Sequence, residues 1–341
     1  MDRDAHGLTR RRLLEAAGAG VVLAGLPPTA LAAAAKPRHQ PGIATPEQPR
    51  LQFAALDATA ADRTELRELM KAWTATARKL SASQRGLTIT FGFGPSLFER
   101  YGLQRPQALQ PLPAFPGDQL DPAKSDGDLA IQICGNHVDL LDHFVAGHPV
   151  IPRWTLAGRH RKDRRNLMGF KDGSNNIAGD DPDAMRYSVW VGARDKPAWM
   201  RGGSYLVARR IRMKLGDWNA TPVNRQERII GRRKHSGAPL DGKHEHDQVE
   251  LSTVPPHAHI RLASPDENAG KMLLRRSYNY DEGLLFLAYQ RHPRQFVAIQ
   301  RRLAEHGDAL SRFIVHEGSA LFACPPGPRA DGFVGEGLLV G

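Results

Sequence analysis

The same order of strand and helix patterns occurs in two successive stretches of the chain, and this repetition limits the fold more than any other feature. In the first stretch, apolar alternation predicts strands and apolar residues at helical spacing predict helices. The predicted strands are 51–56, 87–93, 129–134 and 151–157, the predicted helices are 63–80, 96–101 and 138–146, and a Pro-rich excursion spans 104–128. The order is roughly strand–helix–strand, loop, strand–helix–strand, which is typical of a ferredoxin-like unit.

The pattern restarts after a crossing segment rich in Pro and Asp. The predicted strands are now 204–215, 259–263, 272–278, 284–290 and 320–324, and the predicted helices are 225–233 and 296–305. Two units of similar order indicate an ancient duplication. The sequence therefore predicts an α+β fold of two tandem ferredoxin-like units, with an N-terminal domain at 51–165, a crossing segment at 166–202 and a C-terminal domain at 203–341.

The N-terminus has the pattern of an export signal. The run Thr9-Arg10-Arg11-Arg12-Leu13-Leu14 precedes a weakly apolar segment at 16–26 and small residues suited to cleavage at 30–35. An ordinary secretory signal also starts with basic residues, but paired arginines followed by leucines favour the twin-arginine route, which carries folded proteins. We therefore expect a twin-arginine signal at 1–35, an extended arm at 36–50, no stable membrane insertion, and a periplasmic or extracellular product.

Charge and cysteine content narrow the classes of partner. The 341-residue chain has a formal net charge of +11, which is compatible with nucleic-acid or other anionic partners. It carries no nucleic-acid-binding motif and no basic arm with interleaved aromatics, so we expect no nucleic-acid partner. Cys134 and Cys324, the two cysteines, lie in apolar strand-like runs. They cannot form a disulfide framework and are expected to be buried, inert thiols, with a single disulfide between them as the alternative.

The segment Gly169-Phe-Lys-Asp172-Gly173-Ser-Asn-Asn176 places one acidic side chain in a tight turn. Gly169 and Gly173 permit a backbone that a β-carbon would hinder, and Ser and Asn favour turns because they bond to local backbone. Taken alone, this pattern is also typical of an ordinary surface turn. The turn gains significance from a histidine and an arginine further along the chain.

His259 lies on a predicted strand, where His257, two residues earlier, would share its face. His244 and His246 have the same spacing, and paired imidazoles suit zinc or copper, so a non-haem metal site built on these four histidines is one hypothesis. Arg275 and Arg276 interrupt an apolar strand and would point to opposite sides. One of them can point inward, where a buried guanidinium requires an anion or a polar pocket, while the other is solvated.

Together these residues resemble the dye-decolourising (DyP-type) haem peroxidases, specifically the exported twin-arginine subgroup that includes the deferrochelatase/peroxidases of bacterial iron uptake. The resemblance covers nearly the whole chain. It runs through 42–48, 89–98, 166–176 and 230–234, continues around His259 and Arg275, and closes at 318–327. It implies two ferredoxin-like units of the dimeric α+β barrel type, with haem held mainly by the C-terminal unit.

Carried over by position, the resemblance implies a role for each matching residue. His259 corresponds to the proximal ligand of the haem iron, Asp172 to the distal acid–base residue and Arg275 to the distal arginine. Arg232 would reach a haem propionate. Haem would be lined by Gly173, Ser174, Asn175, Ser264, Pro265, Asp266 and Arg275. The family's carboxylate partner of the proximal histidine aligns with Arg312, whereas Asp308 lies one helical turn away, so the resemblance leaves the acidic partner of the proximal histidine open.

The implied activity is a peroxidase with one haem b per chain. It would reduce hydrogen peroxide and oxidise bulky aromatic, dye-type or other one-electron donors through a ferryl intermediate, with Tyr and Trp side chains as candidate electron relays. The resemblance also allows a haem-handling deferrochelatase that works with components of iron uptake, and homo-oligomers are compatible with either reading. The non-haem metal-binding module remains the third alternative.

Overall fold

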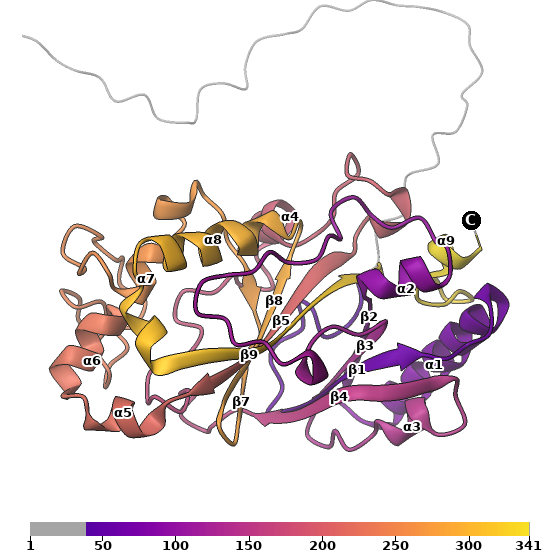
Figure 1. Ribbon diagram of the computed structural model, residues 1–341, viewed down its shortest axis with the longest axis horizontal. Helices are drawn as coiled ribbons and strands as arrows, with labels where there is room; N and C mark the ends of the chain where they lie inside the picture. Colours follow the sequence, from indigo (N-terminus) through magenta and orange to yellow (C-terminus); the bar gives the residue numbers. More distant parts are fainter. Residues whose placement is uncertain (1–38, 341) are drawn as a thin grey trace, which may run out of the picture. The chain divides into compact units, whose positions relative to one another are not determined.

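The structure, a computed structural model, describes residues 39–340, so the predicted signal and the start of the predicted arm lie outside the described residues. The sheet of this part of the chain has nine strands, and each strand pairing in it is antiparallel (Figure 1). Its strands are β1 (Arg50–Ala58), β2 (Thr88–Phe93), β3 (Leu129–Gly135), β4 (Val150–Arg159), β5 (Ser204–Met213), β6 (Leu274–Arg275), β7 (Tyr278–Tyr280), β8 (Gly283–Gln290) and β9 (Ile314–Cys324).

The order of the strands is the same in the two halves. The sheet runs β5-β9-β2-β3-β1-β4-β7-β8-β6, and it closes on itself because β5 also pairs with β8. In the N-terminal half β1 lies between β4 and β3, with β2 beyond β3. In the C-terminal half β5 lies between β9 and β8, with β6 and β7 beyond β8. The predicted α+β fold of two ferredoxin-like units is confirmed.

The helices connect these strands. They are α1 (Arg63–Ser83), α2 (Pro95–Arg100), α3 (Asp142–Val145), α4 (Pro182–Ser188), α5 (Leu215–Ala220), α6 (Val223–Ile230), α7 (His259–Leu262), α8 (Arg294–Glu305) and α9 (Glu336–Leu339). The α1 helix shows how the sequence specifies them. Asp62 accepts hydrogen bonds from the first-turn amides, and Leu66, Met70 and Trp73 recur at helical spacing and are buried. The crossover from β5 to β6 contains α5, α6 and α7 and forms one wall of the site described below.

Three predicted elements differ from the structure. The strand predicted at 259–263 is the short helix α7. Only residues 142–145 of the helix predicted at 138–146 are helical, as α3, and the strand predicted at 272–278 is split into β6 and β7. The split occurs at Arg276, which is 3 % exposed and donates to the Thr45 carbonyl and to Gln48. The prediction that one of the two neighbouring arginines is solvated was therefore wrong, because the N-terminal arm covers Arg276.

The arm and the two cysteines are packed into the protein. Residues 39–49 form no helix or strand, but the buried Gln40 side chain donates to the carbonyls of Phe91 and Pro325. Cys134 and Cys324 are both free and buried. Burial raises the pKa of the Cys134 thiol to about 11, and the pKa of Cys324 is raised for the same reason. The predicted inert thiols are confirmed, and the alternative of a disulfide between them is wrong.

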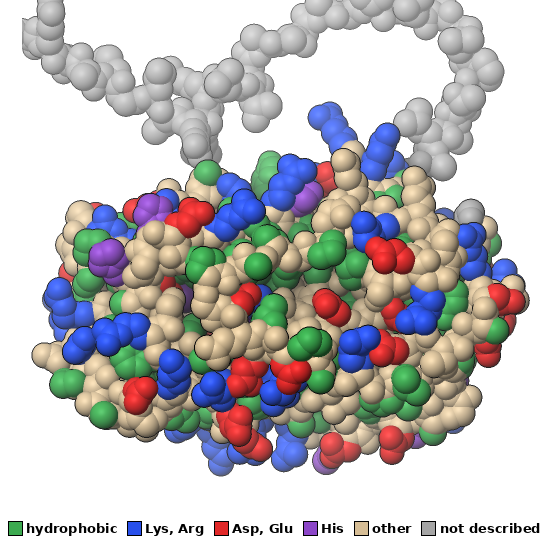
Figure 2. Space-filling model, viewed as in Figure 1, with side chains coloured by type: hydrophobic (Ala, Val, Ile, Leu, Met, Phe, Trp, Pro, Cys, Tyr) green, Lys and Arg blue, Asp and Glu red, His purple; other side chains and the backbone are tan. Residues whose placement is uncertain are grey.

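The surface charge is mixed on the face that Figure 2 shows, where Lys and Arg side chains are interspersed with Asp and Glu. None of the helices within 39–340 is long and apolar enough to cross a membrane.

Candidate active site

The predicted turn around Asp172 is a tight hairpin at the wall of a large cavity. Arg165 and Lys171 form a β-bridge, and the Asp172 amide donates to the Arg164 carbonyl at 3.1 Å. Gly169 has φ +85°, and a β-carbon there would lie 2.7 Å from Cε of Lys234. A side chain at this position would therefore be strained and would collide with its neighbour. The turn that the glycines predict is confirmed, and it places Asp172 half-buried at the cavity.

Glu245 fastens this hairpin to the segment after α6. Its carboxylate binds Lys171 and accepts from Ser174 Oγ at 3.0 Å, while its carbonyl accepts from Nη1 of Arg232 at 2.8 Å. Burial acts to raise the pKa of Glu245, but the bonds from Lys171 and Ser174 outweigh it and hold the pKa below its ordinary value. Glu245 lies in a charged stretch, for which a solvated surface is the ordinary interpretation, but these bonds hold its side chain partly buried at the hairpin.

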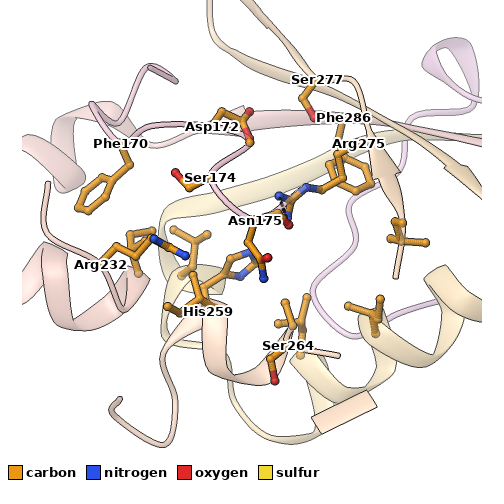
Figure 3. Close-up of a pocket in the computed structure, with 18 of the residues that line it drawn as sticks. Phe170, Asp172, Ser174, Asn175, Arg232, His259, Ser264, Arg275, Ser277 and Phe286 are labelled. Carbon is orange, nitrogen blue, oxygen red and sulfur yellow. Dashed lines mark hydrogen bonds between the residues drawn. The ribbon is translucent and has the colours of Figure 1, made fainter. Parts of the chain in front are cut away.

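Arg275 lies on β6 and reaches the cavity beside the hairpin. Asn176 fixes its backbone from both sides: Oδ1 accepts from the Arg275 amide at 2.9 Å, and Nδ2 donates to the Arg275 carbonyl at 2.7 Å. One guanidinium nitrogen, Nη2, donates to the Asn175 carbonyl at 3.3 Å, while Nε has no partner in the described structure. Figure 3 shows this guanidinium against Asn175, on the same side of the cavity as Asp172.

His259 begins α7 and faces the cavity from another side. Its Nδ1 lies 2.8 Å from Oδ2 of Asp308, whose side chain is 2 % exposed. The other oxygen of Asp308 accepts from the Leu310 amide and so caps the 3₁₀ turn Ala309–Phe313. Since Asp308 occupies Nδ1, the imidazole presents Nε2 as its free nitrogen.

The structure identifies the acidic partner of His259, which the sequence left open. Arg312, which aligns with the family's carboxylate, is exposed, and Asp308 makes the bond instead. The reason is local structure. The segment after α8 is a short 3₁₀ turn, and its capping residue, at the start of the turn, is directed at His259.

These groups surround one cavity of about 690 Å³, within the range of about 300–1,000 Å³ that is usual for ligand pockets. Figure 3 shows the guanidinium of Arg232 and the ring of His259 directed towards the space below the Asp172 hairpin, with Ser264 at the lower edge of the view. Much of the remaining wall is apolar, with Met168, Ile211, Leu273, Phe286, Ile299 and Leu303. The cavity brings together all the residues that the sequence proposed for the site: Asp172, Gly173, Ser174, Asn175, Arg232, His259, Ser264, Pro265, Asp266 and Arg275.

Arg209 was not among the proposed site residues but also lines the cavity. It is 1 % exposed, pairs with Asp118 from the Pro-rich excursion and donates to Ser319 Oγ at 3.1 Å. Its inward position on a strand with alternating apolar residues is the signal that could have identified it. The ion pair holds the Pro-rich segment 104–128 against β5 and β9 at the cavity.

The four histidines of the metal hypothesis do not form one site. His257 is exposed and its Nδ1 bonds to the His306 carbonyl at 2.8 Å, while His244 and His246 lie in an exposed loop. Among residues 39–340, no three His, Cys, Asp or Glu side chains are grouped closely enough to hold a metal ion. The shared strand face on which this hypothesis rested is absent, because His259 starts a helix.

Comparison with known proteins identifies the family. The model of the C-terminal domain of Dyp-type peroxidases matches residues 163–329, and the model of the N-terminal domain matches residues 40–147. The chain belongs to the Dyp-type peroxidase family. It is therefore a peroxidase, and the cofactor of this family is haem.

Similar proteins span most of the chain. It is 37% identical to the dye-decolorizing peroxidase of Thermobifida fusca, covering 89% of this chain and 84% of that protein. It is 33% identical to the deferrochelatase of Escherichia coli K12, covering 99% of each. Among solved structures, ferric DtpA from Streptomyces lividans superimposes with a TM-score of 0.83 at 40% identity, covering 89% of this chain and 96% of that one.

The residues present fit haem. An imidazole whose second nitrogen bonds a buried carboxylate is the usual arrangement of a metal-binding histidine, because the carboxylate orients the ring and raises its basicity. The apolar wall suits a porphyrin, and Arg232 and Arg275 supply positive charge beside it. His259 would hold the iron through Nε2, its free ring nitrogen.

The bond between Asp308 and His259 gives a first prediction. In an Asp308→Asn variant the ring loses its anionic partner and donates less electron density to the iron, so we expect a higher ferric/ferrous midpoint potential and about 10- to 100-fold weaker haem retention. Spectroelectrochemical titration and haem-transfer kinetics measure the two effects. Arg312→Ala is the matched control and should leave both quantities unchanged, whereas wild-type potential and haem retention in Asp308→Asn would mean that Asp308 does not act on the proximal imidazole.

Proposed function

We propose that the chain is a peroxidase in which Asp172 and Arg275 act on hydrogen peroxide and His259, oriented by Asp308, holds haem. One observation carries this assignment. The half-buried carboxylate and the guanidinium approach a single cavity from one side, and the carboxylate-bound imidazole approaches it from another. When bound, haem supplies an iron centre that takes the peroxide and exchanges electrons.

The residues of the cavity would transfer the proton, stabilise charge and position the hairpin. Asp172 takes the proton from one peroxide oxygen and gives it to the other, acting first as general base and then as general acid. Arg275 stabilises the negative charge that develops as the O–O bond breaks, and Asn176 keeps its backbone in place for this task. Glu245 positions the hairpin through Lys171 and Ser174.

The test is peroxide-dependent oxidation of a bulky anthraquinone dye by the haem-loaded protein. A bulky dye is suitable because electrons can pass to it through the protein, so it does not have to enter the cavity. We expect turnover that requires peroxide and exceeds that of an equal amount of free haem. Dye oxidation no faster than that of free haem would contradict the proposal.

A second candidate is a deferrochelatase, since relatives 33–34% identical over 86–99% of their own length bear that name. The distinguishing measurement is porphyrin fluorescence of the haem-loaded protein kept with a reductant. Iron-free porphyrin fluoresces, whereas haem does not. Fluorescence that grows as the haem absorbance falls would favour iron removal, and intact haem with dye oxidation would favour the peroxidase.

We also propose export by the twin-arginine route, on the basis of the run from Thr9 to Leu14 and the short apolar segment after it. Replacing Arg10 and Arg11 by Lys keeps the charge but removes the pair. We expect the double variant to accumulate in the cytoplasm, while the wild type is recovered from the periplasm or the medium, as fractionation and immunoblotting would measure. Normal export of the double variant would point to the ordinary secretory route.

A further inference from the structure

A second, smaller cavity adjoins the active site at the Asp172 hairpin. It has a volume of about 450 Å³, and Lys171, Asp172, Gly173 and Arg275 line both this cavity and the large one. Charged side chains make up much of its remaining wall, among them Glu47, Lys162, Asp163 and Arg164. Asp172 therefore lies between the apolar cavity that suits haem and a polar cavity.

His160 and Glu47 form a pair next to this polar cavity. His160 follows β4, and its ring packs on Tyr278 with 4.3 Å between the ring centroids. Its Nε2 lies 3.5 Å from Oε2 of Glu47 but has no hydrogen-bond partner in the described structure. The same Glu47 oxygen binds Arg164, whose carbonyl accepts from the Asp172 amide. The pair is thus connected to the hairpin that carries Asp172.

The His160 ring is kept neutral chiefly by burial. Burial is the largest of the causes that lower the pKa of His160 to about 4; Arg164 and Arg276 act in the same direction, and Asp172 acts in the opposite one. Glu47 and the phenol of Tyr278 complete its titratable surroundings. A neutral imidazole carries a donor on one nitrogen and an acceptor on the other, so it can take up a proton on one side and release one on the other.

The reduction of peroxide consumes protons, and these must reach the active site from outside it. Reduction of peroxide follows H₂O₂ + 2 e⁻ + 2 H⁺ → 2 H₂O. The transfer that Asp172 performs during O–O cleavage only moves a proton from one peroxide oxygen to the other and supplies neither of the two protons that the equation requires. When the electron donor carries no proton, both must come from solvent. Haem would occupy the large cavity, which leaves the small one open to water.

We propose that the small cavity is the proton path of the active site, in which Glu47 and His160 pass protons from solvent to Asp172. This inference rests on the role proposed for Asp172. His160 acts through Asp172 and does not itself contact the peroxide. It predicts that proton uptake, and not peroxide cleavage, depends on His160.

The first test separates these two steps. Haem-loaded protein is mixed with one equivalent of peroxide and then with ferrocyanide, which donates electrons without protons, in weakly buffered solution with a pH-indicator dye. In His160→Ala we expect peroxide to react at the wild-type rate and proton uptake to be slower by about 100-fold, the lower end of general acid–base effects. Added imidazole should restore uptake by entering the space that the side chain leaves. His137→Ala, at an exposed site outside both cavities, should behave like the wild type.

Two further variants guard against a folding defect. His160→Gln fills similar space without relaying a proton, and Glu47→Gln removes the outer member of the pair, so both should slow proton uptake while the haem spectrum stays unchanged. Uptake at the wild-type rate in His160→Ala would mean that water reaches Asp172 directly, and slow uptake that imidazole does not restore would mean a structural role. Either result overturns the inference. Failure of the wild type to react with peroxide would instead contradict the proposed function.

The second test does not depend on turnover. With ¹³C-labelled histidine and cyanide-bound haem, the ring signals of His160 should titrate well below pH 6.5, and Asp172→Asn should lower the midpoint further because the carboxylate stabilises the charged ring. A His160 signal that titrates near 6.5 and does not respond to Asp172→Asn would show that the two groups are not coupled, and would refute the path.

Discussion

An Asp172→Asn variant should keep its haem and lose most of its reaction with peroxide. The amide occupies nearly the same space as the carboxylate but cannot take up the peroxide proton. Loss of a general acid–base group lowers rates by about 10²- to 10⁴-fold, equivalent to about 3–5 kcal/mol in the barrier. The second-order rate constant for peroxide, measured by stopped-flow absorbance of the haem band, should fall by this factor, while the haem content per chain stays at the wild-type value.

The structure offers a matched control on the same segment. Asp180 is exposed and lines neither cavity. Asp180→Asn makes the same chemical change eight residues after Asp172 and should leave the rate unchanged. If Asp172→Asn reacted with peroxide as fast as this control, Arg275 alone would account for O–O cleavage and the acid–base role of Asp172 would be wrong.

Local sequence patterns were sufficient to predict most of the fold. Alternation of apolar residues located β1, β3, β5 and β8 to within a few residues, and the periodicity of α1 and α8 located those helices. The tight turn at Gly169 followed from the need for a backbone without a β-carbon. These features depend on the residues nearest in sequence, so one sequence contains the information required.

The contacts that complete the site depend on distant residues, and here sequence patterns were insufficient. Asp308 lies 49 residues after His259, and Glu245 lies 71 residues after Ser174. Each is a charged residue in a polar stretch, for which a solvated surface is the ordinary interpretation. The error at His259 has a similar origin: Ala-His-Ile-Arg-Leu alternates like a strand, but the bond to Asp308 and the packing of Leu262 against Ile299 and Leu303 stabilise a helical turn.

His259 lines the cavity and the neighbouring His257 does not, although both are histidines. This difference gives the prediction with the largest expected effect on haem binding. In His259→Ala the cavity keeps its apolar wall but loses the one imidazole with a buried carboxylate partner. We expect the purified variant, produced in a haem-replete host, to lack the Soret band that the wild type shows, since no other imidazole in the described residues has that arrangement. Absorbance normalised to protein concentration measures the effect.

His257→Ala is the matched control, because it removes an exposed imidazole two residues away that bonds only to the His306 carbonyl. It should retain the full Soret band. If His257→Ala lost haem as completely as His259→Ala, the two histidines would act together, and metal analysis of the His-x-His pairs would become the next step. If His259→Ala retained full haem with unchanged spectra, the ligand would have to be another cavity residue such as His316, which also lines the cavity and whose pKa is lowered to about 3 by burial, by Arg209 and by His259.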